Sequence, residues 1–131
     1  ILNNKEITKY SNKVMQEYDV RPNTPNLITS NFSGGNQQKI ILSRELNENP
    51  KVLLVGQPTR GVDIGAIEFI HQRLIDMRDK GAAILLASVE LDEILSLSDR
   101  IIVMFDGKIV GEKVNKNVTD RELGLLMAGV A

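Results

Sequence analysis

Apolar and polar residues follow two distinct patterns along the chain, and each pattern predicts one kind of secondary structure. Near the start, apolar side chains stand at Ile7, Tyr10 and Val14, which is a helical spacing. In contrast, the segment 51–55 has consecutive apolar residues after Lys51 and lies between a proline and a glycine, which predicts a short buried strand. Applied to the whole chain, these patterns predict helices over about 5–18, 34–46, 64–80, 90–97 and 119–127, and strands over 51–55, 82–87, 100–105 and 108–113.

Turn and capping residues separate these elements. The segment 21–31 contains two prolines and several asparagines and predicts a loop, whereas Asp106-Gly107 predicts a tight hairpin turn. Asp63 can cap the helix that follows it, and the segment Thr119–Glu122 has the form of a capping box. Because helices separate successive strands until the final hairpin, the sequence predicts an α/β fold with right-handed parallel crossovers followed by an antiparallel hairpin.

Composition narrows the class of protein. With 131 residues, 42% of them hydrophobic and 25% charged, the chain suits one soluble domain or a large piece of one. A formal net charge of −1 gives no electrostatic reason to expect nucleic acid as a partner. The absence of cysteine excludes disulfides and thiolate metal sites, and the single histidine, His71, argues against a histidine metal cluster. No apolar run reaches the ~20 residues that span a bilayer and no signal-peptide pattern is seen, so we expect a cytoplasmic location.

The segment Asn31–Lys39, with the sequence NFSGGNQQK, combines groups that suit a phosphate. The Ser33 hydroxyl can donate a hydrogen bond to a phosphate oxygen, and Gly34 and Gly35 have no side chain that would keep backbone N–H groups away from an anion. A helix is predicted to begin here, and its N-terminus adds partial positive charge. The alternative is structural, namely a capping serine followed by two loop glycines. Taken alone, the motif favours this structural interpretation.

Further segments follow in a fixed order, and together with this motif they resemble the ATP-binding domains of ABC transporters. The similar segments are Phe32–Lys39 (signature motif), Lys51–Gln57 (Walker B strand), Pro58–Asp63 (Pro-loop and D-loop), Ala83–Glu90 (switch strand), and Ser98–Met104 with Asp106–Gly111 (closing strands). The resemblance extends over residues ~30 to 113, and such an ordered set is far more specific than any one motif.

The resemblance implies both a fold and a function. The fold is part of a P-loop NTPase domain of the ABC type, with a helical signature subdomain over about 1–50 and the C-terminal part of the catalytic core over about 51–131. The implied function is that of the energy-coupling subunit of a membrane importer, a transport-coupled ATPase in its full-length form that lies on the cytoplasmic side of the cell membrane. The resemblance is closest to the second ATP-binding half of importers for ribose, galactose and nucleosides, and the runs Gln57–His71 and Glu90–Ile94 favour the nucleoside branch.

The resemblance also implies partners and site residues. The partners are a second ABC ATP-binding domain, transmembrane permease subunits and a substrate-binding lipoprotein. ABC sites are composite, so the residues assigned to the ATP of a partner domain are Ser33, Gly34, Gly35, Asn36 and Gln38. Asp63, at the end of the D-loop, is implied to couple the two sites as well as to cap its helix. ATP and Mg²⁺ are therefore expected in the full assembly, no tightly bound cofactor is expected in this chain alone, and no metal site is predicted in it.

Three departures from the family pattern bear on mechanism. No Gly-x-x-x-x-Gly-Lys-Ser/Thr phosphate loop occurs in the chain, and the resemblance places that loop before Ile1, so we expect the chain to be part of a longer domain. Gly56 and Gln57 stand where the Walker B strand normally ends in Asp and Glu. The residue that assists magnesium is therefore missing, and Gln57, at the position of the catalytic base, cannot accept a proton. Val89 replaces the switch histidine, so the chain's own half-site is expected to be weak.

Several alternatives stay open. The chain could belong to a non-transport ABC ATPase, although the coiled-coil insertions or basic patches common in such proteins are absent, or it could be an α/β interaction domain with no nucleotide role. Neighbouring genes for permeases and a lipoprotein would favour transport, and ATP binding by the longer protein would exclude the last alternative.

Two single residues and the assembly of the chain also stay open. Arg60 is either a solvated charge or a cross-interface contact, and His71 is either structural or exposed. Because the strands at 52–55 and 83–87 would lack neighbours, the isolated chain is expected to self-associate.

Overall fold

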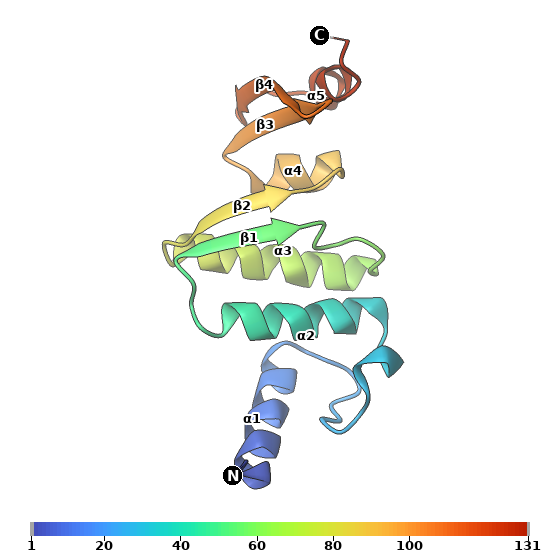
Figure 1. Cartoon of the computed structure of the whole chain (residues 1–131), viewed down its shortest axis with the longest axis vertical. Helices are drawn as coiled ribbons and strands as arrows, with labels where there is room; N and C mark the ends of the chain where they lie inside the picture. The colour runs from blue at the N-terminus through green and yellow to red at the C-terminus, as the bar shows by residue number, and fades with distance from the viewer. Residues whose placement is uncertain (1, 131) are drawn as a thin grey trace. The chain divides into compact units, whose positions relative to one another are not determined.

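The computed structural model describes residues 2–130, and every predicted helix and strand is present (Figure 1). In chain order the elements are α1 (Asn4–Glu17), the 3₁₀-helix η1 (Thr29–Asn31), α2 (Gly34–Leu46), β1 (Val52–Gly56), α3 (Ile64–Asp79), β2 (Ala83–Ala87), α4 (Leu91–Leu97), β3 (Arg100–Phe105), β4 (Lys108–Val114) and α5 (Asp120–Met127). The sequence pattern did not predict η1, which lies at the end of the loop 21–31. Ile1 and Ala131, the ends of the predicted domain, lie outside the described residues.

Two compact units make up the chain, and they divide between Leu85 and Leu86. The first unit contains α1, η1, α2, β1, α3 and the beginning of β2, whereas the second contains the end of β2, α4, the β3–β4 hairpin and α5. The division of the whole domain near residue 50 rests on the resemblance alone and remains a prediction. Within residues 2–130, no helix is both long enough and apolar enough to cross a membrane.

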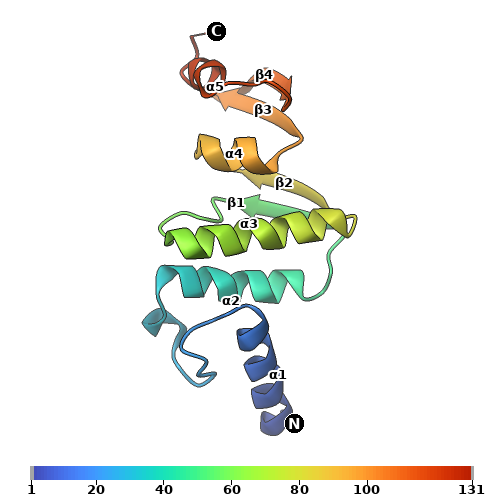
Figure 2. The same ribbon diagram turned by 180° about the vertical axis from the view of Figure 1, so that it is seen from behind.

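In the first unit, α2 and α3 pack side by side and run in the same direction, and α3 covers one face of the β1–β2 sheet (Figures 1 and 2). The helical spacing of Ile67, Ile70, Leu74 and Met77 predicts the inner apolar stripe of α3, and the last three of these residues are buried. At its start the stripe uses Ala66, which is buried, whereas the predicted Ile67 is only half-buried. A small side chain is needed there because the signature loop lies against it.

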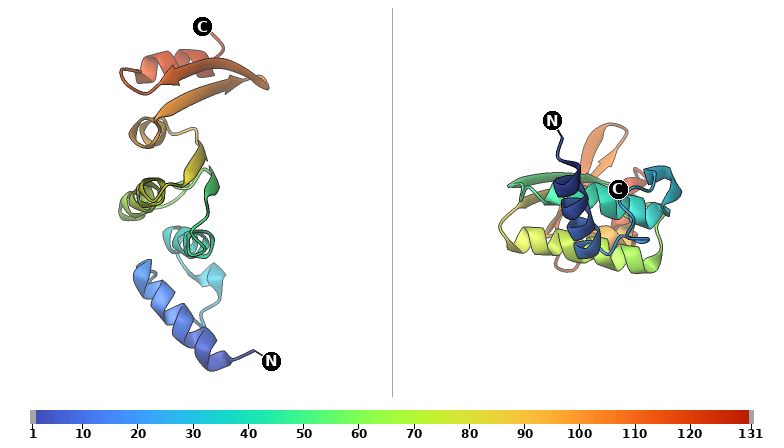
Figure 3. Two further views of the ribbon diagram at one scale, coloured as in Figure 1. Left: turned by 90° about the vertical axis from the view of Figure 1, so that its left-hand side faces the viewer. Right: turned by 90° about the horizontal axis from the view of Figure 1, so that it is seen from below.

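The strands β1 and β2 form a two-stranded sheet and point the same way, which confirms the predicted parallel crossover through α3 (Figures 1 and 3). The Ala83 N–H donates to the Lys51 carbonyl at 2.9 Å and joins the strands at their starting ends. Along β1, Leu53 is buried on the side that α3 covers, whereas Val52 and Leu54 are 65% and 74% exposed. This alternation leaves the other face of the sheet uncovered by the rest of the first unit.

The second unit is built on the β3–β4 hairpin. The strands pair in antiparallel fashion, from Arg100 opposite Val114 to Phe105 opposite Lys108. The turn residues Asp106 and Gly107 have φ angles of 46° and 72°, and two positive φ values are what a hairpin turn of this length requires. Among the described residues β3 pairs only with β4. The alternation of helices and strands in the sequence indicates the direction of a strand but does not determine which strands become neighbours.

A small apolar core holds the second unit together. Ile101 and Val103 of β3 pack with Leu123 of α5, and the partly buried residues around them are Leu91, Ile94, Leu95, Val118 and Leu126. The predicted capping box at the start of α5 is confirmed. Thr119 Oγ1 accepts the Glu122 N–H at 3.3 Å, and the Glu122 carboxylate accepts the Thr119 N–H at 2.9 Å.

Leu123→Ala should destabilise the second unit by about 2–5 kcal/mol, because truncation of this buried side chain leaves a cavity between α5 and the hairpin. Leu125→Ala in the same helix is the matched control. Leu125 is 43% exposed, so its truncation should cost about 0.5 kcal/mol or less. Urea unfolding followed by circular dichroism measures both changes, and equal losses would contradict the packing described above.

The chain by itself should self-associate through the uncovered face and free edges of the β1–β2 sheet. On this face Val52, Leu54 and Leu85 are 65%, 74% and 62% exposed. Free strand edges offer unpaired N–H and C=O groups to a second copy, and apolar surface loses water on association. Leu54→Lys should weaken the association, whereas Leu125→Lys on the other unit should not. Sedimentation equilibrium at tens of micromolar protein is the measurement, and a strictly monomeric unmodified chain would refute the prediction.

Candidate functional site

The signature loop lies where α2 begins. Ser33 is the N-cap of α2, and its Oγ accepts hydrogen bonds from the Asn36 backbone N–H at 3.4 Å and from Asn36 Nδ2 at 2.9 Å. The structural interpretation of Ser33 as a capping serine is therefore confirmed. Ser33 is also exposed, and capping uses only its oxygen as an acceptor. Capping thus leaves the hydroxyl proton accessible to a ligand.

The two glycines let the start of α2 approach the start of α3. A Cβ on Gly35 would lie 2.9 Å from the Ala66 Cβ and 3.0 Å from Asp63 Oδ2, and a Cβ on Gly34 would lie 3.0 Å from the Gly61 carbonyl oxygen. Real Cβ atoms essentially never come within 2.9 Å of a neighbour, and an approach of 3.0 Å is tighter than nearly all real Cβ contacts. The sequence suggested glycines here for access to an anion. The structure adds a second reason, which is that the signature loop packs directly against the D-loop.

Asp63 links these two loops. Its Oδ1 accepts the Ala66 N–H at 2.9 Å and caps α3, as the sequence predicts. Its other carboxylate oxygen faces Gly35. The D-loop position therefore forms part of the wall against which the signature loop rests. Whether it also couples two ATP sites remains a prediction.

β1 ends at Gly56 and Gln57 follows it, and these are the two residues predicted to stand in place of the Walker B carboxylates. Gly56 is exposed, and a Cβ built on it would meet nothing within 4 Å. Packing therefore does not require glycine at this position. What the glycine changes is the chemistry of the position, because it carries no carboxylate. Gln57 is half-buried with a left-handed φ of 50°, and the Arg60 N–H donates to its carbonyl at 3.2 Å. The chain thus turns sharply at Gln57.

Two helices present their N-termini at the same end of the first unit, beside the carboxyl end of β1 (Figures 1 and 2). Each N-terminus carries a partial positive charge of roughly half an elementary charge. At α3 the cap is the Asp63 carboxylate, whereas at α2 it is the neutral Ser33 hydroxyl. No carboxylate cap balances the partial charge at the N-terminus of α2. Of the two helix ends, this one is therefore suited to an external anion.

A turn at residues 19–21 contacts α2 next to the signature loop. Asn36 Oδ1 accepts the Arg21 backbone N–H at 2.8 Å, and Lys39 Nζ donates to the Asp19 carbonyl at 3.1 Å. The Arg21 side chain bonds the Asp19 carboxylate at 2.8 Å, and this hydrogen bond, with a smaller contribution from Lys39, lowers the pKa of Asp19. The sequence did not reveal this contact, because proline and asparagine signals mark a turn without showing which helix it meets.

Arg73 of α3 ties the end of α1 to the same helices. Its guanidinium donates to the Glu17 carbonyl at 2.7 Å and lies over the Tyr18 ring, 4.9 Å from the centroid. The Phe69 ring receives two cations, Arg73 at 5.1 Å and Lys39 at 4.8 Å. Each such contact contributes about 0.5–2 kcal/mol, depending on its exposure. The cluster therefore joins α1, α2 and α3 into one support for the start of α2.

The other predicted residues lie on α2, in the D-loop, on α3 and after β2. Gln38 is half-buried on α2, Arg60 is exposed in the D-loop, and His71 is half-buried on α3. Val89 is 62% exposed and follows β2 in the second unit. The roles proposed for these residues remain predictions.

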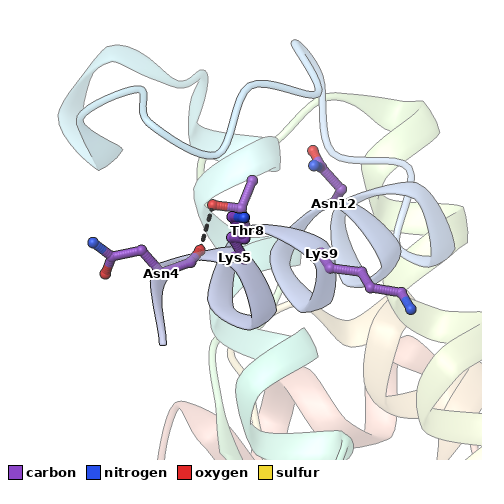
Figure 4. Close-up of a pocket in the computed structure, with 5 residues that line it drawn as sticks. All are labelled: Asn4, Lys5, Thr8, Lys9 and Asn12. Atoms are coloured by element: carbon purple, nitrogen blue, oxygen red, sulfur yellow. Dashed lines mark hydrogen bonds between the residues drawn. The ribbon is translucent and has the colours of Figure 1, made fainter. Parts of the chain in front are cut away.

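Residues 2–130 contain no group of three or more histidine, cysteine, aspartate or glutamate side chains that could hold a metal ion. One hollow runs along α1 and is lined by five residues of that helix, Asn4, Lys5, Thr8, Lys9 and Asn12 (Figure 4). The Thr8 hydroxyl donates to the Asn4 carbonyl at 2.8 Å within it. No residue of the signature loop or D-loop lines this hollow, so it is separate from the candidate site.

Comparison with curated proteins finds relatives of high identity. The chain is 51% identical over 131 residues to the guanosine import ATP-binding protein NupO of Bacillus subtilis, and the alignment covers 98% of this chain and 25% of that protein. It is 52% identical over 124 residues to the nucleoside import ATP-binding protein NupA of Lactococcus lactis, and the alignment covers 95% of this chain and 24% of that protein. The chain spans about a quarter of the length of these curated relatives. No protein-family model matches the chain.

Solved structures share the fold. A dimeric ATP-binding cassette in a post-hydrolysis state with ADP and phosphate matches with a TM-score of 0.74 at 24% identity, over 90% of this chain and 51% of that chain. An ATP-binding subunit of an ABC transporter matches with a TM-score of 0.76 at 19% identity, over 97% and 56%. These matches confirm the predicted fold, part of a P-loop NTPase domain. Because identity with the relatives extends over nearly the whole chain and the motifs stand in the family's order, the chain belongs to the ATP-binding proteins of ABC transporters.

Proposed function

We propose that the chain forms part of the energy-coupling ATP-binding subunit of an ABC importer for nucleosides or simple sugars. Its relatives include import ATP-binding proteins for guanosine, nucleosides, glucose and ribose. Identity is 51% and 52% with the guanosine and nucleoside proteins but 40% with the glucose protein and with one ribose protein. This difference supports a nucleoside as the transported solute.

In this proposal the chain works with a second ABC ATP-binding domain, transmembrane permease subunits and a substrate-binding lipoprotein, on the cytoplasmic side of the membrane. The candidate site supports the first of these partners. The chain offers a helix N-terminus and a serine hydroxyl to a phosphate, but its sequence contains no Gly-x-x-x-x-Gly-Lys loop to hold the nucleotide. ATP would therefore lie between that loop, supplied by a partner domain, and the start of α2.

The observation that carries the proposal is the geometry at the start of α2. The exposed Ser33 hydroxyl can donate to a terminal phosphate oxygen, and the positive end of the helix favours negative charge at the same point. Mg²⁺ bound with ATP would neutralise part of the phosphate charge. Neither a serine hydroxyl nor a glycine N–H acts as a base at neutral pH, so this loop contributes binding and orientation of the phosphate.

The chain's own half-site is the weak one in this proposal. Gly56 offers no carboxylate to the hydrated metal, although the space for a side chain exists. Gln57 can orient a water molecule but cannot remove its proton. Val89 cannot donate a hydrogen bond to a phosphate. An importer containing this chain would therefore have one working ATP site and one weak site.

In an assembled importer that contains this chain, Ser33→Arg should reduce transport-coupled ATP hydrolysis by about 100-fold or more, because the bulky side chain blocks the phosphate position. Gly34→Asp should do the same, since its carboxylate repels the phosphate and its Cβ meets the Gly61 carbonyl. Gln57→Ala should lower the rate of hydrolysis by less than about tenfold. Gln57 is not a base, so its removal does not take away the roughly 10²–10⁴-fold contribution of a general base. Phosphate release in proteoliposomes measures all three.

Gly56→Ala is the control for these variants, because a methyl group meets nothing within 4 Å and should leave hydrolysis unchanged. Melting temperatures identify variants that fail for lack of folding. Equal losses for Ser33→Arg and Gln57→Ala in folded protein would refute the assignment of one working and one weak site.

The 131-residue chain alone should not bind Mg·ATP tightly, because it has neither the phosphate loop nor a carboxylate at position 56. Isothermal titration calorimetry at neutral pH should show no binding with a Kd in the low micromolar range. Binding of that strength would contradict the proposed division of the site between two domains.

A further inference from the structure

The side-chain amide of Asn36 bridges the signature serine and the turn at residues 19–21. Its Oδ1 accepts the Arg21 backbone N–H at 2.8 Å, and its Nδ2 donates to Ser33 Oγ at 2.9 Å. The amide can take only this orientation, because a backbone N–H is purely a donor and must face the amide oxygen. The amide nitrogen is therefore the group that faces Ser33.

This bridge determines which way the Ser33 hydroxyl can act. A serine hydroxyl has one proton to donate and two lone pairs that accept. In Ser33 the oxygen already accepts from Asn36 Nδ2 and, at 3.4 Å, from the Asn36 backbone N–H. Within residues 2–130 no group accepts the Ser33 hydroxyl proton, and the residue is exposed. The hydroxyl is thus held as a donor that points toward solvent.

The bridge is held firmly at its far end. Lys39, one helical turn after Asn36, donates to the Asp19 carbonyl at 3.1 Å and lies 4.8 Å from the Phe69 ring centroid. The Arg21 side chain bonds the Asp19 carboxylate at 2.8 Å. The turn at 19–21 is therefore attached to α2 at two points, and the amide of Asn36 has little freedom to rotate.

We propose that Asn36 is a positioning residue that commits the Ser33 hydroxyl to donating a hydrogen bond to a phosphate oxygen. This inference rests on the proposed function of Ser33. A donor oriented in advance needs no reorganisation when a charged acceptor arrives, and this is the condition under which such a donor contributes most. Because its amide oxygen and nitrogen each have a partner within the chain, Asn36 acts through Ser33 in this proposal.

The substitution that separates orientation from shape is Asn36→Asp. Aspartate has the same shape and can still accept the Arg21 N–H, but it cannot donate to Ser33 Oγ. It would instead accept the hydroxyl proton and withdraw it from the phosphate. We expect Asn36→Asp to weaken binding of a non-hydrolysable ATP analogue by more than about tenfold, and Asn36→Ala to weaken it by about three- to tenfold.

The decisive test is a double-mutant cycle in an assembled importer that contains this chain, with the Kd of the non-hydrolysable ATP analogue as the readout. If Asn36 acts through Ser33, Asn36→Ala should weaken binding in the unmodified protein but should have no further effect in a Ser33→Ala background. Equal effects of Asn36→Ala in the two backgrounds would overturn the inference. No effect of Ser33→Ala would instead refute the proposed function, so the two failures are distinguishable.

Two further measurements keep the test independent of folding. Glu45→Ala, at an exposed position near the end of α2, should leave the Kd and the melting temperature unchanged. In the 131-residue chain without nucleotide, the ¹⁵N resonance of the Asn36 side-chain amide should shift on Ser33→Ala and its protons should exchange faster. An unchanged resonance would show that the bridge is absent in solution and would overturn the inference.

Discussion

The close approach of α2 to the start of α3 is the constraint on which the candidate site depends. At Gly35 there is no space for a methyl group, because Ala66 and Asp63 occupy it, and at Gly34 the Gly61 carbonyl lies as near. This contact places the signature loop on the D-loop within one chain. A movement of either loop would therefore press on the other.

The same contact brings two helix N-termini together, and their caps give them different roles. The carboxylate of Asp63 balances the positive end of α3, whereas Ser33 caps α2 without charge. The chemistry of the chain is correspondingly one-sided. The start of α2 has hydrogen-bond donors and partial positive charge, whereas Gly56 and Gln57 at the end of β1 carry no carboxylate.

The packing around α1 supports the start of α2. Arg73 holds the end of α1 through the Glu17 carbonyl and the Tyr18 ring, and Lys39 connects α2 to Asp19 and to Phe69. These contacts are polar and partly exposed, so each is modest, but they meet on the face of α2 that begins with the signature loop. Through Asn36 they reach the serine hydroxyl itself.

The sequence by itself determined the elements, the order of the motifs and the chemistry of single positions. Helical spacing, the Asp106-Gly107 turn, the Thr119 capping box and the Asp63 cap are local properties, and each appears in the structure as predicted. The absence of a carboxylate at Gly56 and Gln57 is likewise read directly from the sequence.

Only the tertiary structure decided which of these local pieces meet. The turn at Arg21 lies fifteen residues before Asn36, and no periodic pattern connects a loop to the helix face it will contact. The burial of Ala66 in place of Ile67, and the steric reason for Gly35, also follow from a contact between two helices. The physical reason is that local propensity depends on neighbours in sequence, whereas a close approach depends on the volumes of residues far apart in the chain.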